Sequence, residues 1–240
     1  MAHPQHPGPP ADPSEDVRGR PAPPPARTTA YGPDPAQVYD LRLPEGRALT
    51  TGVVVVHGGF WRAEHDRSHA ACQAQALADA GHPTAVLEYR RAGMPGGGWP
   101  GTADDVAAAV AAVRADPAMP DRLVLVGHSA GGHLVAWAAG EPWAAGLAGV
   151  VDLQAAFEKR LGDGAVEAFL GATPDTRPEA YAAADPSRHV PRVPVALVHG
   201  ADDDVVPAAI SQAYAEQVGE ARGAAPVTLA VVEGCEHFGL

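Results

Sequence analysis

Apolar residues along the chain gather in short runs that predict strands. Most of these runs are almost continuously apolar and rich in valine, which is typical of strands buried on both faces of a sheet. The first run alternates between apolar and polar positions and so predicts a strand with one exposed face. The predicted strands cover residues 38–43, 53–56, 84–89, 123–126, 148–151, 193–198 and 227–232.

Alanine-rich segments lie between these strands and predict helices. Gly81 is a suitable end for the first helix, because glycine readily takes the left-handed backbone found at helix ends. Strands that alternate with helices imply right-handed crossovers and a mainly parallel sheet flanked by helices. In such sheets the functional residues lie beyond the carboxyl ends of the strands. The predicted helices cover residues 69–80, 102–115, 130–139, 164–170, 177–184 and 208–218.

The beginning of the chain differs from the rest. Nine prolines fall within the first 25 positions, and large apolar side chains are almost absent there. Such a segment cannot bury enough apolar surface to offset the entropy of ordering it, so we expect a disordered, proline-rich tail over residues 1–30. The folded part is expected over residues 31–240, a length that suits one α/β domain rather than two.

The overall charge narrows the choice of partners. The chain has 29 acidic and 17 basic residues, which gives a formal net charge of -12. A surface this acidic disfavours nucleic acid and anionic membranes, but it says little about a small molecule. No apolar run is long enough to span a membrane, and the N-terminus lacks the order of a signal peptide. Cys72 and Cys235 do not suggest a disulfide framework, so we expect a cytoplasmic protein.

The most informative motif follows the predicted strand over 123–126. It has the pattern G-x-S-x-G between a strand and a helix, and it reads Gly127-His128-Ser129-Ala130-Gly131. In this context the serine sits on a sharp turn at a helix N-terminus, where the helix dipole favours a developing negative charge. Ser129 is therefore the predicted nucleophile.

A second motif follows the predicted strand over 53–56 and reads His57-Gly58-Gly59-Phe60-Trp61. A loop of such small residues can turn backbone N–H groups toward the oxygen of a substrate carbonyl. An oxyanion hole of this kind combines loop N–H groups with that of the residue after the nucleophile. We assign its donors to Gly59, Phe60 and Ala130.

Acidic and basic candidates follow the last two predicted strands. Asp202, Asp203 and Asp204 come after the strand over 193–198, and three consecutive carboxylates at a strand end suggest an acid site. Only one of them can orient a histidine, and the residues alone do not say which. His237 follows the last strand, and no histidine comes after it in the chain. The order Ser…Asp…His is one of the orders known for catalytic triads.

Together these motifs resemble α/β-hydrolase esterases that have an HGG[FY]W oxyanion loop. Kynurenine formamidases (arylformamidases) and BD-FAE-like carboxylesterases share these features, and the resemblance covers about residues 29–240. In this group's H-G-x-x-D-x-x-V-P pattern the acid stands four residues after the histidine, which here is His199. The resemblance therefore implies Asp203 as the acid, the triad Ser129, Asp203 and His237, and a mechanism that needs neither a metal nor an organic cofactor.

Two further features bear on the substrate. The aromatic residues Trp61, Trp99 and Phe238 lie next to the motifs and suggest an acyl pocket, although packing within the loops is an equal alternative. The stretch over 153–191 is longer than one crossover needs, so a small cap is expected there, between the predicted strands over 148–151 and 193–198.

Other polar residues have a structural interpretation beside the functional one. His65 and His69 have a spacing that could bind a metal on a helix, but with no third ligand in sight we interpret them as surface histidines. Arg90 and Arg91 could bind a substrate carboxylate, or they could form salt bridges at a strand end. His133 is interpreted as a packing or hydrogen-bonding residue of its helix.

The sequence therefore predicts a serine hydrolase that acts on a small-molecule ester. An amidase of the arylformamidase type, with a substrate similar to N-formylkynurenine, would use the same triad and is the alternative. A non-catalytic relative that only binds a ligand is the third hypothesis, and the complete set of Ser, Asp and His argues against it. The physiological substrate and the oligomeric state stay open.

Overall fold

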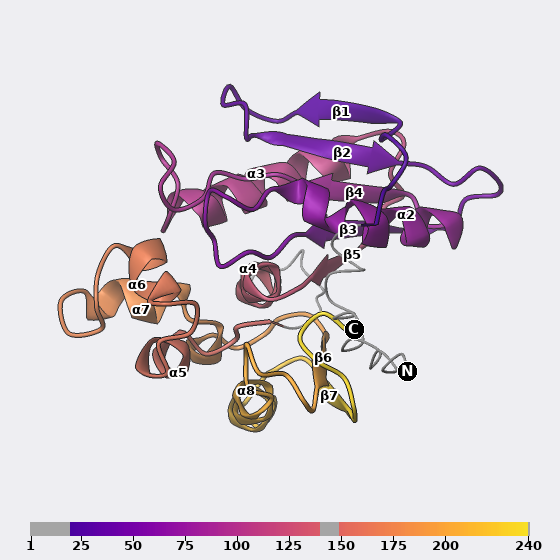
Figure 1. Cartoon of the computed structure of the whole chain (residues 1–240). Helices are drawn as coiled ribbons and strands as arrows, with labels where there is room; N and C mark the ends of the chain where they lie inside the picture. The colour runs from indigo at the N-terminus through magenta and orange to yellow at the C-terminus, as the bar shows by residue number, and fades with distance from the viewer. Residues whose placement is uncertain (1–19, 140–148, 240) are drawn as a thin grey trace, which may run out of the picture.

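The computed structural model describes residues 20–139 and 149–239. Its larger sheet has the strand order β1-β2-β4-β3-β5 and is mixed (Figure 1). The pairs β1–β2 and β2–β4 are antiparallel, whereas β3 pairs in parallel with both β4 and β5. These strands are β1 (Arg27–Ala30), β2 (Val38–Arg42), β3 (Thr51–Val56), β4 (Thr84–Leu87) and β5 (Arg122–Gly127).

A second, two-stranded sheet carries the C-terminal part of the chain. Its strands, β6 (Val195–Gly200) and β7 (Val227–Val232), are parallel. The expected strand over 148–151 is not present as a ladder: Gly149 makes an isolated bridge to Ser129, Val150 and Val151 lie outside any strand, and residue 148 is outside the described residues. The sheet predicted as continuous and mainly parallel is therefore split at this point into a mixed part and a parallel part.

The helices lie close to where the apolar pattern predicts them. A turn of 3-10 helix, η1 (Arg67–Ala70), precedes the first α-helix, and the second, η2 (Pro186–Arg188), precedes β6. The α-helices are α2 (Ala71–Asp79), α3 (Gly101–Ala115), α4 (Ala130–Ala138), α5 (Leu153–Glu158), α6 (Ala165–Leu170), α7 (Pro178–Ala184) and α8 (Ala209–Gly219).

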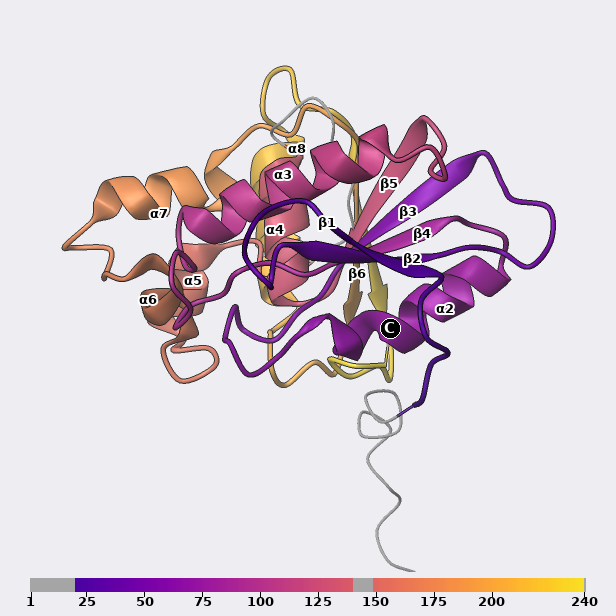
Figure 2. The same cartoon turned by 90° about the horizontal axis from the view of Figure 1, so that it is seen from above.

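The larger sheet is covered on both faces. Along β3, Val53 and Val55 pack with Ala70 and Ala74 on one face, whereas the alternate valines join the main core on the other face. Figure 2 shows α2 and α3 on opposite sides of these strands. Burial on both faces explains why β3 is a continuous run of valines.

The domain begins earlier than the sequence suggests. β1 occupies residues 27–30 and pairs along its length with β2, so the last four residues of the expected tail belong to the sheet. The prediction of disorder for residues 1–19 lies outside the described residues. β1 is short and mostly exposed, which explains why its apolar signal is weak.

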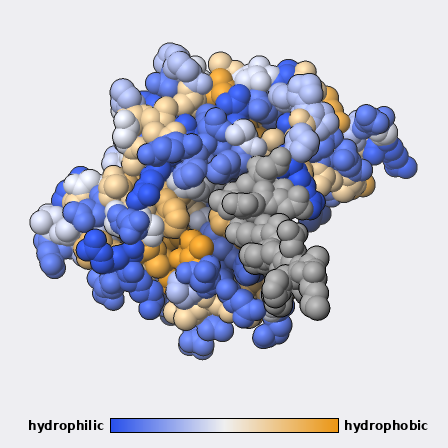
Figure 3. Space-filling model, in the orientation of Figure 1, coloured by the Kyte–Doolittle hydropathy of each residue, from blue (hydrophilic) through white to orange (hydrophobic). Residues whose placement is uncertain are grey.

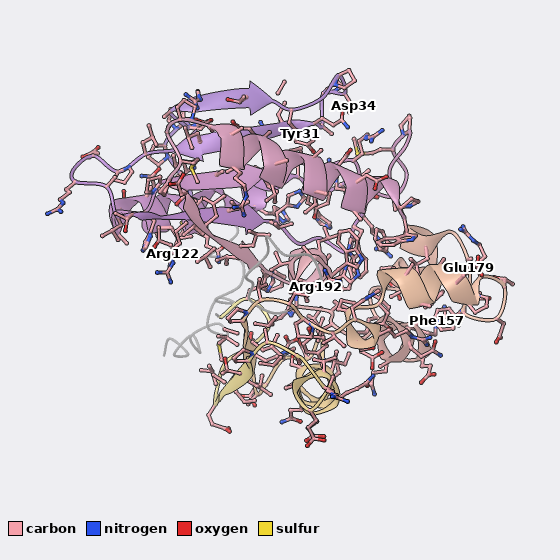
Figure 4. All side chains as sticks on the ribbon, turned by 180° about the vertical axis from the view of Figure 1, so that it is seen from behind. Tyr31, Asp34, Arg122, Phe157, Glu179 and Arg192 are labelled. Carbon is pink, nitrogen blue, oxygen red and sulfur yellow. The ribbon has the colours of Figure 1, made fainter. Side chains whose placement is uncertain are left out.

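The segment predicted as a cap is helical and contains α5, α6 and α7. Phe157 of α5 packs edge-on against Tyr181 of α7, with 5.9 Å between the ring centroids. Figure 4 shows Phe157 and Glu179 of this insertion on the opposite side of the molecule from Arg122, where β5 begins. The insertion therefore lies toward the carboxyl ends of the strands.

Hydrophilic residues cover most of the face shown in Figure 3, and hydrophobic ones gather in a small patch near its centre. Such a surface fits the acidic composition of the chain. Within the described residues, no helix combines the length and the apolar character needed to cross a bilayer.

Candidate active site

The turn after β5 holds Ser129 in a strained conformation. Its backbone has φ 56° and ψ -119°, a region that residues other than glycine rarely occupy. The turn also needs small neighbours: a Cβ atom added to Gly131 would lie 2.0 Å from the carbonyl oxygen of Val56. β5 and α4 can therefore approach closely and set Ser129 at the carboxyl end of the sheet, as the G-x-S-x-G motif requires.

α4 begins immediately after the serine and is buried along nearly its whole length. Its N-terminus carries the positive end of the helix dipole, which favours negative charge beside Ser129. Ala130 is the first residue of the helix, so its N–H group has no acceptor within the helix. This amide lies next to the predicted nucleophile, where an oxyanion donor is needed.

The loop after β3 runs directly against this turn. A Cβ atom added to Gly58 would lie 3.2 Å from the Cβ atom of Ser129. Phe60 and Trp61 have positive φ values of 51° and 54°, so the chain turns sharply beside the predicted donors Gly59 and Phe60. The structure thus brings the loop and the Ser129 turn together at one end of the sheet.

Buried polar groups fix the start of the loop. Nε2 of His57 lies 3.2 Å from a carboxylate oxygen of Glu88, and its Nδ1 lies 2.8 Å from the carbonyl oxygen of Gly58. The hydroxyl of Tyr89 donates to the carbonyl oxygen of His57 over 2.6 Å, and the two rings stack. The residue that opens the loop is therefore held by the two residues that directly follow β4.

The arginine pair after β4 forms salt bridges within the protein. Arg90 binds both carboxylate oxygens of Asp105, at 2.8 Å and 2.7 Å. The guanidinium of Arg91 binds the carboxylate of buried Glu88. Of the two sequence interpretations of this pair, the structure favours salt bridges over a carboxylate-binding site.

Asp203 is the aspartate that meets the predicted base. Its Oδ2 atom accepts a hydrogen bond from Nδ1 of His237 over 2.7 Å. Its other oxygen accepts from the amides of Val205 and Val206, at 3.0 Å and 2.7 Å. The side chain of Asp203 is 2% exposed. Asp202 and Asp204, on either side, are exposed residues.

The environment of Asp203 keeps it ionised. Burial alone would raise the pKa of this carboxyl group. Hydrogen bonds from His199, His237 and the Val206 amide outweigh burial and hold the pKa well below its usual range. A carboxylate that stays charged at neutral pH is the partner that an imidazole needs when it accepts a proton.

His237 is also held through its backbone. Nε2 of His128, the residue before the predicted nucleophile, donates to the carbonyl oxygen of His237 over 2.7 Å. The two imidazole rings lie 4.5 Å apart between centroids. Burial, together with the nearby His237, lowers the pKa of His128 to about 4, so this imidazole is neutral at pH 7. One hydrogen bond thus connects the turn that carries Ser129 to the loop that carries His237.

A cavity of about 350 Å³ opens at this point, and both Ser129 and His237 line it. The predicted oxyanion loop forms part of the wall, from His57 to Phe60. Phe238 and Val205 add apolar surface, and Phe238 is the one predicted pocket residue that the wall contains. None of the described residues of the α5–α7 insertion lines the cavity, although Arg62 donates to the carbonyl of Gly162 in that insertion.

Of the two tryptophans that the sequence suggests as pocket residues, Trp61 lies in the core and the partly buried Trp99 packs against it. Trp61 is 1% exposed, stacks on Phe169 with a centroid distance of 4.7 Å, and donates through Nε1 to Nδ1 of His133 over 3.2 Å. Trp99 packs edge-on against Trp137, at 5.5 Å, and against Phe169. Both tryptophans therefore have a packing role, which is the alternative that the sequence left open.

Sequence reasoning missed three polar residues of the wall: His65, His69 and Gln73. The sequence interpretation placed the two histidines on the surface, away from any site. A spacing of four residues was the available signal, because on a helix it would put all three on one side. In the structure His65 precedes η1, His69 lies in η1 and Gln73 lies in α2. Within the described part of the chain, no group of three or more potential ligands is placed to hold a metal ion.

The strained serine beside the His237–Asp203 pair, on this fold, defines a serine hydrolase of the α/β-hydrolase type. The model of the prolyl oligopeptidase family matches residues 73–240, more than half of the chain, so the chain belongs to that family. A search of curated proteins with this sequence finds no match.

Solved structures with the same fold include several esterases. A truncated carbohydrate esterase from gut microbiota is 21% identical and superposes with a TM-score of 0.75, over 89% of this chain and 90% of that one. Esterase B from Lactobacillus rhamnosis is 20% identical, with a TM-score of 0.73 over 92% and 79% of the two chains. Esterase 2 from Thermogutta terrifontis, solved with propionate bound, is 22% identical, with a TM-score of 0.64 over 88% and 84%. At these identities the likeness establishes the fold.

Proposed function

We propose that this enzyme hydrolyses carboxylic esters with a small or medium acyl group, through an acyl-enzyme on Ser129. The observation that carries the proposal is the 2.7 Å hydrogen bond between His237 and Asp203 at a cavity that Ser129 also lines. His237 takes the proton of Ser129 as its hydroxyl attacks the carbonyl carbon, and Asp203 stabilises the imidazolium that forms. Water activated by the same imidazole then releases the acid.

The oxyanion of each tetrahedral intermediate is assigned to the N–H groups of Gly59, Phe60 and Ala130. A single donor of this kind contributes about 3–4 kcal/mol to transition-state stabilisation in comparable hydrolases. The positive end of the α4 dipole acts in the same direction. The three donors and the helix dipole all belong to the backbone, so the stabilisation of the oxyanion requires no cofactor.

The size of the cavity supports short acyl groups. About 350 Å³ must accommodate both the acyl and the alcohol parts of the ester, and Phe60, Phe238 and Val205 give it apolar walls. The Thermogutta terrifontis esterase 2 with bound propionate shows that this fold accommodates a small acid. We therefore expect acetate and propionate esters to be better substrates than octanoate esters.

An aryl formamide is the second candidate substrate. The His57-Gly58-Gly59-Phe60-Trp61 loop resembles that of the kynurenine formamidases and BD-FAE-like carboxylesterases, and Phe60 and Phe238 could stack on an aryl ring. The same triad would cleave the formyl amide. The two candidates differ only in the bond that is broken.

The test is turnover of p-nitrophenyl acetate, propionate, butyrate and octanoate beside N-formylkynurenine. We expect Ser129→Ala to reduce kcat for the best substrate about a million-fold, and a fluorophosphonate to label Ser129 of the wild-type enzyme. Faster turnover of the formamide than of every ester would favour the second candidate. Undiminished turnover by Ser129→Ala, or a label on another residue, would refute the assignment of the nucleophile.

A further inference from the structure

A second imidazole lies on the carboxylate that supports the base. Nε2 of His199 is 3.1 Å from Oδ2 of Asp203, the same oxygen that accepts the hydrogen bond from His237. His199 belongs to β6, and Asp203 stands four residues later in the loop that follows. The side chains of both residues are at most 5% exposed, so water does not screen the contact.

The neighbours of His199 determine which of its nitrogens carries a proton. Nε2 also lies 2.7 Å from the carbonyl oxygen of Val206, so both of its neighbours are acceptors and Nε2 must be the donor. Nδ1 lies 2.7 Å from the hydroxyl of buried Ser211 in α8. The ring is thus fixed between β6, the acid loop and α8, with its proton directed at Asp203 and Val206.

We propose that His199 is a positioning residue of the triad. It fixes Oδ2 of Asp203 and weakens the electrostatic attraction between that oxygen and His237. The proposal rests on the proposed function, because it takes Asp203 as the acid. Oδ1 is already held by two amides. Nε2 of His199 and Nδ1 of His237 both lie within 3.1 Å of Oδ2, so each carboxylate oxygen contacts two nitrogen atoms, and the carboxylate cannot rotate away from His237 without losing several of these contacts.

Besides His199 and Asp203, the titratable groups around this contact come from two further loops. His237 reaches Asp203 from the loop after β7, and His128 reaches the carbonyl of His237 from the nucleophile turn. Burial lowers the pKa of His199, but its hydrogen bonds to Asp203 and to the Val206 carbonyl, with the charge of Asp203, outweigh burial and raise it. His199 therefore gains a proton more readily than an isolated buried imidazole.

Loss of the His199 donor has a consequence for the pH profile. Without it, the full negative charge of Oδ2 acts on His237 and stabilises the protonated base. Because a protonated base cannot accept the serine proton, activity is then lost at a higher pH on the acid side. A residue that only filled space would change stability or the amount of active enzyme, and it would leave the position of the acid limb unchanged.

Two substitutions of His199 by amide side chains of different length distinguish a positioning role from mere filling of space. The amide of His199→Gln reaches about as far as Nε2 and can still donate to Asp203, whereas that of His199→Asn reaches only about as far as Nδ1 and Ser211. We expect the acid limb of kcat/KM for p-nitrophenyl acetate to move up by about half a pH unit in His199→Asn and to stay near wild type in His199→Gln. The pH-independent value of kcat/KM should fall roughly tenfold in His199→Asn, because Asp203 is less well oriented.

Controls make both outcomes decisive. Titration with a fluorophosphonate counts the reactive serines, and His189→Asn repeats the substitution at a histidine that bonds the Ala183 carbonyl away from the cavity. The proposal is overturned if the acid limb of kcat/KM lies at the same pH in wild type and His199→Asn. It is also overturned if His199→Asn and His199→Gln move that limb equally. If His199→Asn does not fold, Ser211→Ala removes the partner of Nδ1, and a smaller shift in the same direction is required. If Asp203→Asn retains full activity, the proposed triad fails, whatever His199 does.

Discussion

The proposed nucleophile and the proposed base are supported in different ways. Ser129 follows β5 of the five-stranded sheet, next to β3, in which Val54, Val55 and Val56 are at most 1% exposed. His237 follows β7 of the two-stranded sheet, in which Val231 and Val232 are 37% and 39% exposed. The comparison teaches that apolar burial and backbone sterics fix the nucleophile, whereas polar contacts fix the base.

A small network of hydrogen bonds and close polar contacts holds His237. His237 is held by Asp203 through its ring and by His128 through its carbonyl oxygen, and Asp203 is held in turn by His199 and two amides. Such a network is strong only when every member is satisfied. Single polar substitutions should therefore damage the base side, whereas single apolar truncations should damage the nucleophile side.

Among the substitutions that compare the two kinds of support, Asp203→Asn is expected to have the largest effect. An amide cannot stabilise the imidazolium of His237 and can hold the ring in the wrong tautomer, so kcat falls about ten-thousandfold. Steady-state kinetics with p-nitrophenyl acetate measures it. Asp202→Asn and Asp204→Asn change the same charge at exposed neighbours and should stay near wild type. A large loss in either neighbour, with Asp203→Asn active, would move the acid to that residue.

The next effect concerns stability and compares the two sheets directly. Leu125 of β5 is fully buried, so Leu125→Ala should lower the free energy of unfolding by about 2–5 kcal/mol. Val232→Ala, at the exposed end of β7, should lower it by less than about 0.5 kcal/mol. Urea unfolding of both variants measures the difference. Equal losses would mean that the small sheet is packed as firmly as the large one.

The last comparison concerns the response of stability to acid. Burial lowers the pKa of His128 and of His133 to about 4, below the 6.5 of an exposed histidine. The unfolded chain therefore binds these protons first, and the free energy of unfolding falls between pH 6.5 and 4.5 by about 2 kcal/mol for each imidazole. His199 acts in the opposite direction: its pKa is raised, so it contributes stability below pH 6.5 and loses it as the pH rises.

Urea unfolding at pH 7 and pH 4.5 tests this prediction. His133→Gln keeps a donor and an acceptor at the buried position but cannot titrate, so its loss of stability across this range should be smaller than in wild type. The carboxyl groups of Asp203 and Glu88, whose pKa values are lowered, lose their contribution mainly below this range. If the free energy of unfolding falls as much between pH 7 and pH 4.5 in His133→Gln as in wild type, protonation of His133 is not the cause of the loss.

The sequence predicted most strand and helix positions because apolar periodicity is a local signal. It also predicted which residues meet at the carboxyl edge, since Ser129, Asp203 and His237 each follow a strand and parallel strands end together. It failed over residues 149–151, the described part of the run, where the structure has a single bridge from Gly149 to Ser129. A run of apolar residues shows that a segment is buried, but it does not show whether a neighbouring strand pairs with it.

The aromatic residues show a second limit. Phe60 and Trp61 are adjacent, yet Phe60 lines the cavity and Trp61 lies in the core. Both have positive φ values, so the usual alternation of a strand does not tell where their side chains point. Spacing along the chain identifies the loop that carries a residue, whereas the direction of its side chain depends on a local turn that no pattern of residue types specifies.

The indole of Trp61 gives its N–H to Nδ1 of His133, so Nε2 of that ring carries the proton that it donates to the carbonyl of Ala184 over 2.9 Å. The oxyanion loop, the helix behind the nucleophile and the end of the insertion thus share one chain of hydrogen bonds. For protein engineering, this makes the insertion a poor module to exchange, although the cavity wall does not include it. A shorter loop grafted in its place would need a carbonyl group at the position of Ala184, or the ring of His133 behind Ser129 would lose its anchor.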